Sequence, residues 1–119
     1  MKVILDTNFL IDCIRFKIDI ESELMGNEIF VLESIIFEIE RITKRGTKES
    51  SLAKIAFDYI KRKGLKVLNS KEKDTDISLL KYSKKGYAIA TQDKFLKDKL
   101  KKERGKVIYI RQKKYVVFE

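Results

Sequence analysis

The stretch Val3-Ile4-Leu5-Asp6-Thr7-Asn8 joins an unbroken apolar run to a carboxylate near the start of the sequence. A short run without polar alternation is typical of a parallel strand that is covered on both faces. Apolar residues between positions 9 and 14 then recur at helical spacing, and Thr7 or Asn8 is a suitable N-cap. The stretch therefore predicts a strand, an aspartate at its carboxyl end and a helix directly after it.

The same order of elements continues along the rest of the sequence. Further strands are expected at 29–32, 66–68, 87–90 and 107–110. Helices are expected at about 19–25, from Ser34 toward Gly46, at 48–63, from Thr75-Asp76 to Gly86 and from about Phe95 to Gly105, with a polar loop at 69–74. This alternation predicts an α/β fold, a three-layer α/β/α sandwich with a mostly parallel central sheet, in a single domain that spans residues 1–119.

Apolar positions predict which side of each helix faces the core. In the helix that Ser34 is expected to cap, the positions are Ile35, Ile39 and Ile42. In the later helices they are Leu52, Ile55, Ala56 and Tyr59, then Ile77 and Leu80, then Phe95, Leu96 and Leu100. The lone Cys13 lies among apolar neighbours, so we expect a buried thiol rather than a disulfide or a reactive group.

Four acidic residues occupy positions from which they reach one edge of such a sheet. Asp6 and Asp93 follow strands. Asp76 stands at the start of a helix, where Asp74 is the alternative, and Glu38 lies about one turn inside a helix. Parallel sheets bind ligands outside the carboxyl ends of their strands, and helical side chains lean toward the N-terminus. We therefore expect the four carboxylates to gather there, although each aspartate alone is also typical of a helix cap.

The sequence contains no histidine, which narrows the chemistry. Histidine acid–base catalysis, Ser-His and Cys-His nucleophiles and ordinary zinc sites are excluded, because each needs an imidazole or several thiols. Carboxylate oxygens suit Mg²⁺ or Mn²⁺. Two ionised carboxylates about 5 Å apart repel each other by roughly 3 kcal/mol, so a cluster of four requires cations or protonation. A divalent metal site for phosphodiester chemistry is the simplest prediction.

The net charge of +9 comes from 27 Lys and Arg against 18 Asp and Glu. Such an excess suits a polyanionic partner, but it is also typical of solvated helix faces. The apolar runs are too short to cross a membrane, and an acid at position 6 interrupts any signal-peptide pattern. We expect a cytoplasmic protein without a membrane partner.

The basic residues near the C-terminus differ from the others because tyrosines are interleaved with them. Arg111, Lys113, Lys114 and Tyr115 are candidates for RNA binding, in which cations pair with phosphates and rings stack on the bases of a single strand. The tyrosines are equally suited to packing in the core or on a strand edge. The apolar segment 116–118 is expected to cover a sheet edge or to contact a partner.

In the order and spacing of its acids, the sequence resembles the PIN-domain nucleases. Asp6-Thr7-Asn8 looks like the opening motif of that family, Glu38 and Asp76 match its helix glutamate and central aspartate, and Thr91-Gln92-Asp93 resembles its closing motif. Gln92 departs from the pattern, because the family commonly has asparagine there. The resemblance covers nearly the whole chain and is closest to small archaeal PIN proteins that are similar to the eukaryotic pre-rRNA processing factor, some of which are labelled VapC-type toxins.

This resemblance implies an endoribonuclease that depends on Mg²⁺ or Mn²⁺. Asp6, Glu38, Asp76 and Asp93 would be its catalytic metal ligands, and Thr7, Asn8 and Thr91 would orient the carboxylates or water from behind them. The expected partners are single-stranded RNA, a ribosomal precursor or an antitoxin, and a second copy of the chain in a homodimer. Two alternatives remain: an RNA-binding ribosome-assembly factor with little or no activity, and a metal-dependent phosphatase or DNA nuclease.

Overall fold

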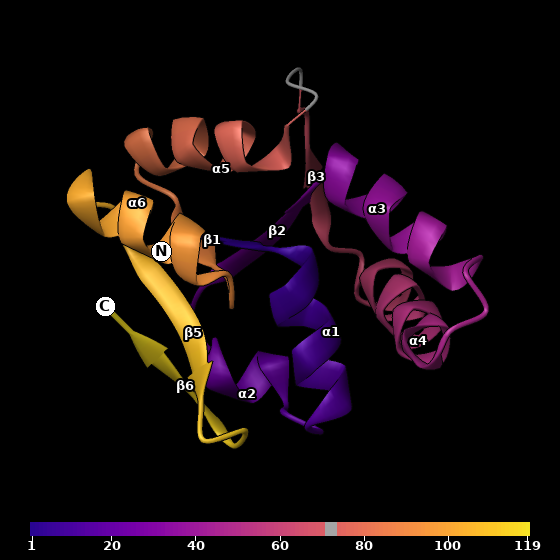
Figure 1. The fold of residues 1–119 in the computed structure, drawn as a ribbon. Helices are drawn as coiled ribbons and strands as arrows, with labels where there is room; N and C mark the ends of the chain where they lie inside the picture. Colours follow the sequence, from indigo (N-terminus) through magenta and orange to yellow (C-terminus); the bar gives the residue numbers. More distant parts are fainter. Residues whose placement is uncertain (71–73) are drawn as a thin grey trace.

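A six-stranded sheet forms the centre of the computed structural model, which describes residues 1–70 and 74–119 (Figure 1). The strand order is β3-β2-β1-β4-β5-β6. The strands are β1 (Lys2–Leu5), β2 (Glu28–Leu32), β3 (Lys66–Leu68), β4 (Ala88–Ala90), β5 (Val107–Arg111) and β6 (Tyr115–Phe118). All neighbours pair in parallel except β5 and β6, which are antiparallel. The prediction of a mostly parallel sheet is confirmed.

Helices lie on both faces of this sheet and complete the predicted three layers. They are α1 (Thr7–Arg15), α2 (Ile20–Glu23), α3 (Glu33–Thr43), α4 (Lys48–Lys63), α5 (Thr75–Lys84) and α6 (Lys94–Lys102). In Figure 1, α1, α3 and α4 cover one face, whereas α5 and α6 cover the other. The helices change face because the chain moves outward from β1 to β3 and then returns to β4, while each crossover stays right-handed. No helix in the described residues is long and apolar enough to span a bilayer.

The core lies between the middle strands and the helices. Every residue of the runs Val3–Leu5 and Ala88–Ala90 is fully buried, as expected for parallel strands covered on both faces. From the helices, Ile35 and Ile39 are fully buried, and Cys13 is a buried free thiol, as the sequence predicts. These central strands fix the position of the residues that follow them.

Helix α5 begins at Thr75 as predicted, but two predicted N-caps were wrong, and the N-cap of α1 is Asp6 rather than Thr7 or Asn8. Leu32 occupies the N-cap position of α3, and no side chain caps that helix. The predicted cap, Ser34, lies inside the first turn, where its backbone N–H donates to the Ser70 hydroxyl at 2.9 Å. At α5 the N-cap is Asp74, whose carboxylate accepts from the backbone N–H of Asp76. The remainder of the predicted loop, 71–73, lies outside the described residues.

The predicted core faces of the last three helices were partly wrong. Ile55 and Ile77 are half exposed, and Phe95 is 82% exposed. Helix α4 packs on α1 and α3 through the fully buried alanines Ala53 and Ala56 rather than through Ile55. The buried positions of α5 and α6 are Ser78, Leu79, Leu96 and Leu100. Each helix carries more apolar side chains than its contact face can bury, so periodicity alone misplaced the face.

The C-terminal segment forms the edge strand β6, which is one of the two roles expected for 116–118. Its turn places Gln112 and Lys113 at φ angles of 54° and 56°, a left-handed pair that matches the twist of a tight hairpin. On the outer side of β6, the Glu23 carboxylate accepts from the backbone N–H of Val116 at 2.9 Å. This bond from α2 satisfies one of the exposed donors that an edge strand presents.

Candidate active site

The strand order reverses direction between β1 and β4, and this point organises the candidate site. From β1 the chain continues to β2 on one side, and β4 occupies the other side. The backbone N–H of Asp6 donates to the carbonyl of Ala90 at 2.8 Å, so the ends of the two strands lie side by side. Open α/β sheets bind ligands at such a reversal, because the loops diverge there and leave a crevice.

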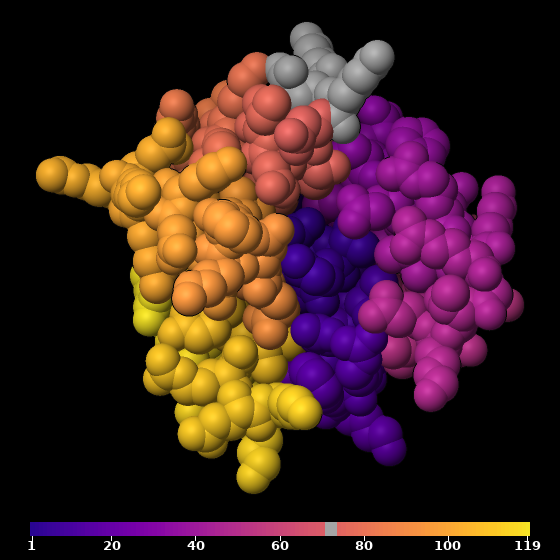
Figure 2. All heavy atoms as spheres, in the orientation of Figure 1, coloured from indigo at the N-terminus to yellow at the C-terminus, as the bar shows by residue number. Residues whose placement is uncertain are grey.

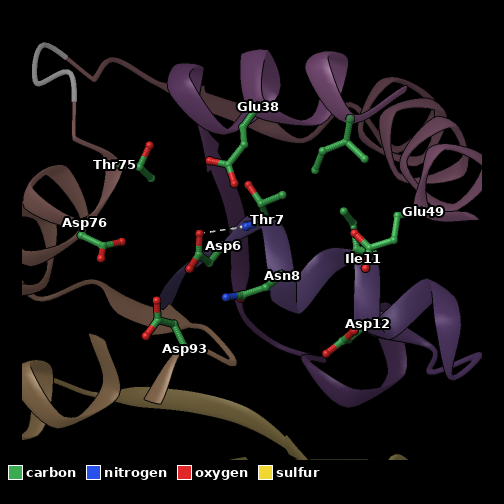
Figure 3. A pocket seen from close by; sticks show the side chains of 11 residues that line it. Asp6, Thr7, Asn8, Ile11, Asp12, Glu38, Glu49, Thr75, Asp76 and Asp93 are labelled. Atoms are coloured by element: carbon green, nitrogen blue, oxygen red, sulfur yellow. Dashed lines mark hydrogen bonds between the residues drawn. The ribbon is translucent and has the colours of Figure 1, made fainter. Parts of the chain in front are cut away.

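A cleft of about 280 Å³ opens at this reversal and is strongly acidic. Figure 2 shows a hollow in which the indigo surface of the first residues is bordered by α3, α5 and α6. The lining residues are Asp6, Thr7, Asn8, Ile11, Asp12, Glu38, Ile42, Glu49, Thr75, Asp76 and Asp93. All four predicted carboxylates line it, and Figure 3 shows them arriving from different elements around Asp6.

Asp6 lies at the centre of this group and is held from two sides. As the N-cap of α1, it accepts from the backbone N–H of Thr7 at 2.9 Å through Oδ1. Its Oδ2 accepts from the Thr91 hydroxyl at 2.7 Å. Burial raises the pKa of this carboxyl from 3.8 to about 6, against the lowering effect of these two hydrogen bonds. The nearby carboxylates of Glu38 and Asp76 raise this pKa further, so both burial and electrostatic repulsion disfavour the charged form of Asp6.

The structure distinguishes Asp76 from the alternative, Asp74. The carboxylate of Asp74 is engaged in capping α5, where it accepts from the backbone N–H of Asp76 at 2.9 Å. The Asp76 side chain lines the cleft instead. Burial raises the pKa of Asp76, the carboxylates of Asp93 and Asp74 raise it further, and the positive charge of Lys99 opposes them. Asp76 therefore belongs to the acidic group, whereas Asp74 supports the helix that presents it.

Thr91 and Asn8 connect the strand ends behind the acids. Thr91 Oγ1 donates to Asp6 and accepts from the backbone N–H of Asp93 at 3.2 Å. The Asp93 carboxylate caps α6 through the N–H of Leu96 at 3.1 Å. Asn8 Oδ1 accepts from the backbone N–H of Gln92 at 3.0 Å. These contacts fix the positions from which Asp6 and Asp93 reach the cleft.

Thr7 differs from these two residues because its hydroxyl is buried without a partner. Its side chain is nearly inaccessible, and Oγ1 has no hydrogen-bond partner in the part of the chain that the structure describes. Figure 3 shows this oxygen on the cleft side, facing Glu38. A buried unpaired hydroxyl costs about 1–3 kcal/mol, so its place in the cleft suits a bond to water or to a ligand.

Two further carboxylates in the cleft were missed by the sequence analysis. Asp12 and Glu49 line its outer part, and both pair with Arg15. Arg15 Nη1 donates to Asp12, and Arg15 Nη2 donates to Glu49 at 2.7 Å. The spacing of Asp12 and Arg15 on one helix was a visible signal for an ion pair. Glu49 gave no such signal, because it reaches the cleft only through the packing of α4 against α1.

The donor set of the cleft fits a hard divalent cation. Its charged groups are carboxylates, and the pKa of Asp6 is raised mainly by burial and further by the neighbouring carboxylates, so a cation beside Asp6 would favour its charged form. Nevertheless, no three acidic or thiol side chains among the described residues approach closely enough to hold one ion together. The carboxylates surround the cleft at a wider spacing than coordination requires, so an ion would have to draw them inward.

The predicted RNA-binding residues lie outside this cleft. Arg111, Lys113, Lys114 and Tyr115 form the ends and the turn of the β5–β6 hairpin. The guanidinium of Arg111 donates to Tyr109 Oη at 3.0 Å, and Lys113 Nζ lies 5.7 Å from the ring centre of Phe16. Lys97 Nζ lies over the Tyr109 ring, 4.3 Å from its centre, so one face of this ring is already occupied. The hairpin stays a predicted RNA contact, separate from the acids.

Gln92, the departure from the expected asparagine, has a structural role. Its Oε1 accepts from the backbone N–H of Ile110 at 2.6 Å. The side chain therefore joins the end of β4 to β5, and its proximity to Asp12 on α1 opposes the rise that burial causes in the pKa of that carboxyl. Its backbone N–H still donates to Asn8, so the longer amide leaves that contact in place.

Comparison with known proteins agrees with this fold. The profile of the family described as "PIN like domain" matches residues 3–113. The chain is 34% identical to Ribonuclease VapC4 of Methanocaldococcus jannaschii over 96% of this chain and 93% of that protein. A solved domain of a functionally unknown protein from the same organism superposes with a TM-score of 0.69 at 19% identity, covering 92% of this chain and 91% of its own. At that identity the solved domain supports the fold alone.

Proposed function

This chain belongs to the PIN-like domain family, and on that basis we propose that it is a metal-dependent endoribonuclease that hydrolyses RNA phosphodiesters in the acidic cleft. The observation that carries the proposal is the convergence of Asp6, Glu38, Asp76 and Asp93 where the strand order reverses. The similarity to a protein named Ribonuclease VapC4 extends over nearly the full length of both chains, which supports RNA as the substrate.

The four carboxylates would hold Mg²⁺ or Mn²⁺. When bound, such an ion activates water and stabilises negative charge on the phosphate that is attacked. The environment of Asp6 supports this assignment, because burial and the neighbouring carboxylates raise the pKa of its carboxyl and a cation would stabilise the charged form. The chain does not supply an alternative acid–base group of the usual kind, since it contains no histidine.

The residues behind the carboxylates have distinct tasks in this proposal. Thr91 holds Asp6 in one orientation through the bond to Oδ2, and Asn8 keeps the loop after β4 close to α1. The free hydroxyl of Thr7 is placed to donate to a water or to a phosphate oxygen in the cleft. All three therefore act by positioning groups that the substrate meets.

Among the possible roles we favour that of a VapC-type toxin, which an antitoxin would neutralise. The name and full-length similarity of the Methanocaldococcus jannaschii relative support this choice. Processing of a ribosomal RNA precursor is the other role, and it rests on the sequence resemblance alone. In either role the expected substrate is single-stranded RNA, and a homodimer is the expected assembly.

A second candidate function is a ribosome-assembly factor that binds RNA and cleaves it slowly or not at all. The spacing of the acids favours it, because no three of them in the described ranges are close enough to share one ion. An enzyme needs the ion to draw these side chains together, whereas a binding protein does not. Activity measurements separate the two functions directly.

The decisive experiment is cleavage of a labelled single-stranded RNA by the purified protein with Mg²⁺, with Mn²⁺ and with EDTA. Asp6→Asn is the test variant. Asp58→Asn is the matched control, because Asp58 is an exposed acid on α4 that pairs with Arg62 and does not line the cleft. We expect cutting that needs the metal, is lost in Asp6→Asn and persists in Asp58→Asn. Tight RNA binding without cutting under every metal condition would favour the assembly factor.

A further inference from the structure

Phe95 is the most exposed of the large apolar side chains in the part of the chain that the structure describes. It lies in the first turn of α6, two residues after Asp93. Leu96 and Leu100 bury the other side of this helix, which directs the Phe95 ring away from the core. An exposed aromatic ring gains nothing from the fold, because its hydrophobic surface remains in water.

The surroundings of this ring are charged rather than apolar. Lysines occupy five of the nine positions of α6, at 94, 97, 99, 101 and 102. Phe95 lines a surface hollow together with Lys94 and Asp98. Two of the lysines are engaged elsewhere: Lys97 lies over the Tyr109 ring, and Lys101 pairs with Glu119. Lys94 and Lys99 have no ion pair or ring contact among the described residues, so either ammonium group can approach a phosphate.

Phe95 is also close to the acidic cleft. Asp93, the N-cap of α6, lines the cleft, and Phe95 lies in the first turn of the same helix. Lys99 acts electrostatically on Asp76, where it opposes the rise in the pKa of that carboxyl. Helix α6, which carries both residues, therefore borders the acidic cleft, and Figure 2 shows its orange surface at the edge of the hollow.

We propose that Phe95 is a stacking platform for one nucleobase of a single-stranded RNA, with Lys94 and Lys99 contacting the phosphates on either side of it. The proposal rests on the proposed function, because the strand that it positions is the one whose phosphodiester enters the cleft. A base held on Phe95 would align the strand along α6, the helix that Asp93 caps, so the platform would influence which phosphodiester reaches the carboxylates.

A nucleic acid suits this surface better than a protein does. Lysine is depleted in the cores of protein interfaces, where apolar and aromatic residues gather. Here a single ring stands among lysines. Proteins that bind single strands use this combination, because the base stacks on the ring while cationic side chains pair with the backbone phosphates. Any base can stack in this way, so the platform is expected to tolerate sequence variation.

Fluorescence gives a direct test, because the chain contains no tryptophan. Phe95→Trp introduces a single indole at the platform, and its emission can be followed in EDTA so that no RNA is cut. We expect a short single-stranded oligoadenylate to quench this emission, whereas inorganic polyphosphate, which has charge but no bases, does not. Equal quenching by both, or by neither, would show that no base stacks on this position.

Binding affinities supply the second measurement. Phe95→Ala is expected to weaken oligoadenylate binding in EDTA by about 5- to 150-fold, the range that corresponds to the loss of one stacked base. Phe95→Trp should retain the affinity, and Phe95→Leu, which keeps the apolar bulk without a ring, should lose most of it. Unchanged affinity in Phe95→Ala would overturn the proposal, and so would a change of oligomeric state without a change of affinity.

The results distinguish a failure of the stacking proposal from a failure of the proposed nuclease function. If no metal supports cleavage but oligoadenylate still quenches the indole, the nuclease assignment fails and the platform stands. If the protein cleaves RNA but the KM and the RNA affinity of Phe95→Ala match those of the unaltered chain, the nuclease stands and the platform fails.

Discussion

Thr91 donates its hydroxyl hydrogen to Oδ2 of Asp6 at 2.7 Å, and Thr91 Oγ1 itself accepts from the backbone N–H of Asp93 at 3.2 Å. Thr91 is fully buried. One side chain therefore holds the carboxylate of Asp6 and the backbone of Asp93 in position, and it does so from the protein side, without occupying the cleft. This relationship links the packing of β1 against β4 to the chemistry of the site.

Thr91→Val is expected to lower RNA cleavage by at least about tenfold, because Asp6 loses the donor that fixes its orientation. Valine keeps the shape and burial of the side chain. The free energy of unfolding should fall by about 1.5–3 kcal/mol, the usual range for a hydrogen bond to a charged group. Thr91→Ser, which keeps the hydroxyl, is the control for cleavage and for urea unfolding. Equal activity in the valine and serine variants would show that this bond does not position Asp6.

Asp6 should make the metal-free protein less stable as the pH rises. Its pKa is about 6 in the folded protein against an ordinary value of 3.8, so the folded state holds the proton more tightly than the unfolded state. This contribution is fully present below about pH 4 and is lost as the pH rises through 6, and it amounts to about 3 kcal/mol. Urea unfolding in EDTA at pH 5 and pH 7.5 should record about half of this contribution, because the carboxyl of the unfolded chain is already ionised at pH 5.

Asp6→Asn removes this pH dependence and serves as the comparison. The variant should gain stability relative to the unaltered chain on going from pH 5 to pH 7.5. Parallel pH profiles for the two proteins would contradict the assignment of a raised pKa to Asp6.

Divalent ions should stabilise the folded chain at pH 7.5, because they would favour the ionised form of Asp6, which burial and the neighbouring carboxylates disfavour. A ligand that binds only the folded state at about 100 times its dissociation constant adds about 2.7 kcal/mol. Thermal unfolding with increasing Mg²⁺ or Mn²⁺ should therefore show a rising midpoint. The midpoint of Asp6→Asn should rise much less, and that of Asp58→Asn should follow the unaltered chain. Identical responses in all three proteins would indicate weak surface binding of the ion outside the cleft.

The sequence predicted the sheet and the grouping of the four acids because both depend on local patterns. Apolar runs such as Val3–Leu5 have no alternative to a buried strand, and an aspartate directly after such a run must lie at the sheet edge. The parallel pairing of β1 and β4 then brings Asp6 and Thr91 together without further information.

The parts that were missed depend on tertiary packing. Glu49 reaches the cleft because α4 packs on α1, and nothing near position 49 indicates this. Phe95 and Ile77 are apolar residues on helices that bury a different face, so their exposure depends on the angle at which each helix meets the sheet. The strand β6 was expected only as an apolar segment, because its pairing requires the edge of β5.

The pair Asp74 and Asp76 offers a matched test of the central acid. Asp76→Asn should reduce cleavage by at least about tenfold while leaving stability nearly unchanged, because its burial penalises the charged form. Asp74→Asn should leave cleavage within about twofold, since asparagine is as good an N-cap as aspartate. Cleavage rates and urea midpoints of both variants check this. Loss of activity in Asp74→Asn with retention in Asp76→Asn would reverse the assignment.

Gln92→Asn tests whether the longer amide is a structural adaptation of this chain. Asparagine is one methylene shorter, so its side-chain oxygen cannot reach the backbone N–H of Ile110. Gln92 Oε1 accepts a hydrogen bond from that N–H at 2.6 Å. We expect the free energy of unfolding to fall by about 1 kcal/mol and the Ile110 amide to exchange its hydrogen faster. RNA cleavage should persist, because the backbone N–H at position 92 still donates to Asn8.

Amide exchange followed by NMR identifies the Ile110 signal directly, and the amide of Ile89, which donates to the Lys106 carbonyl, is an internal control. Unchanged protection at Ile110 would show that the side chain of Gln92 does not secure β5.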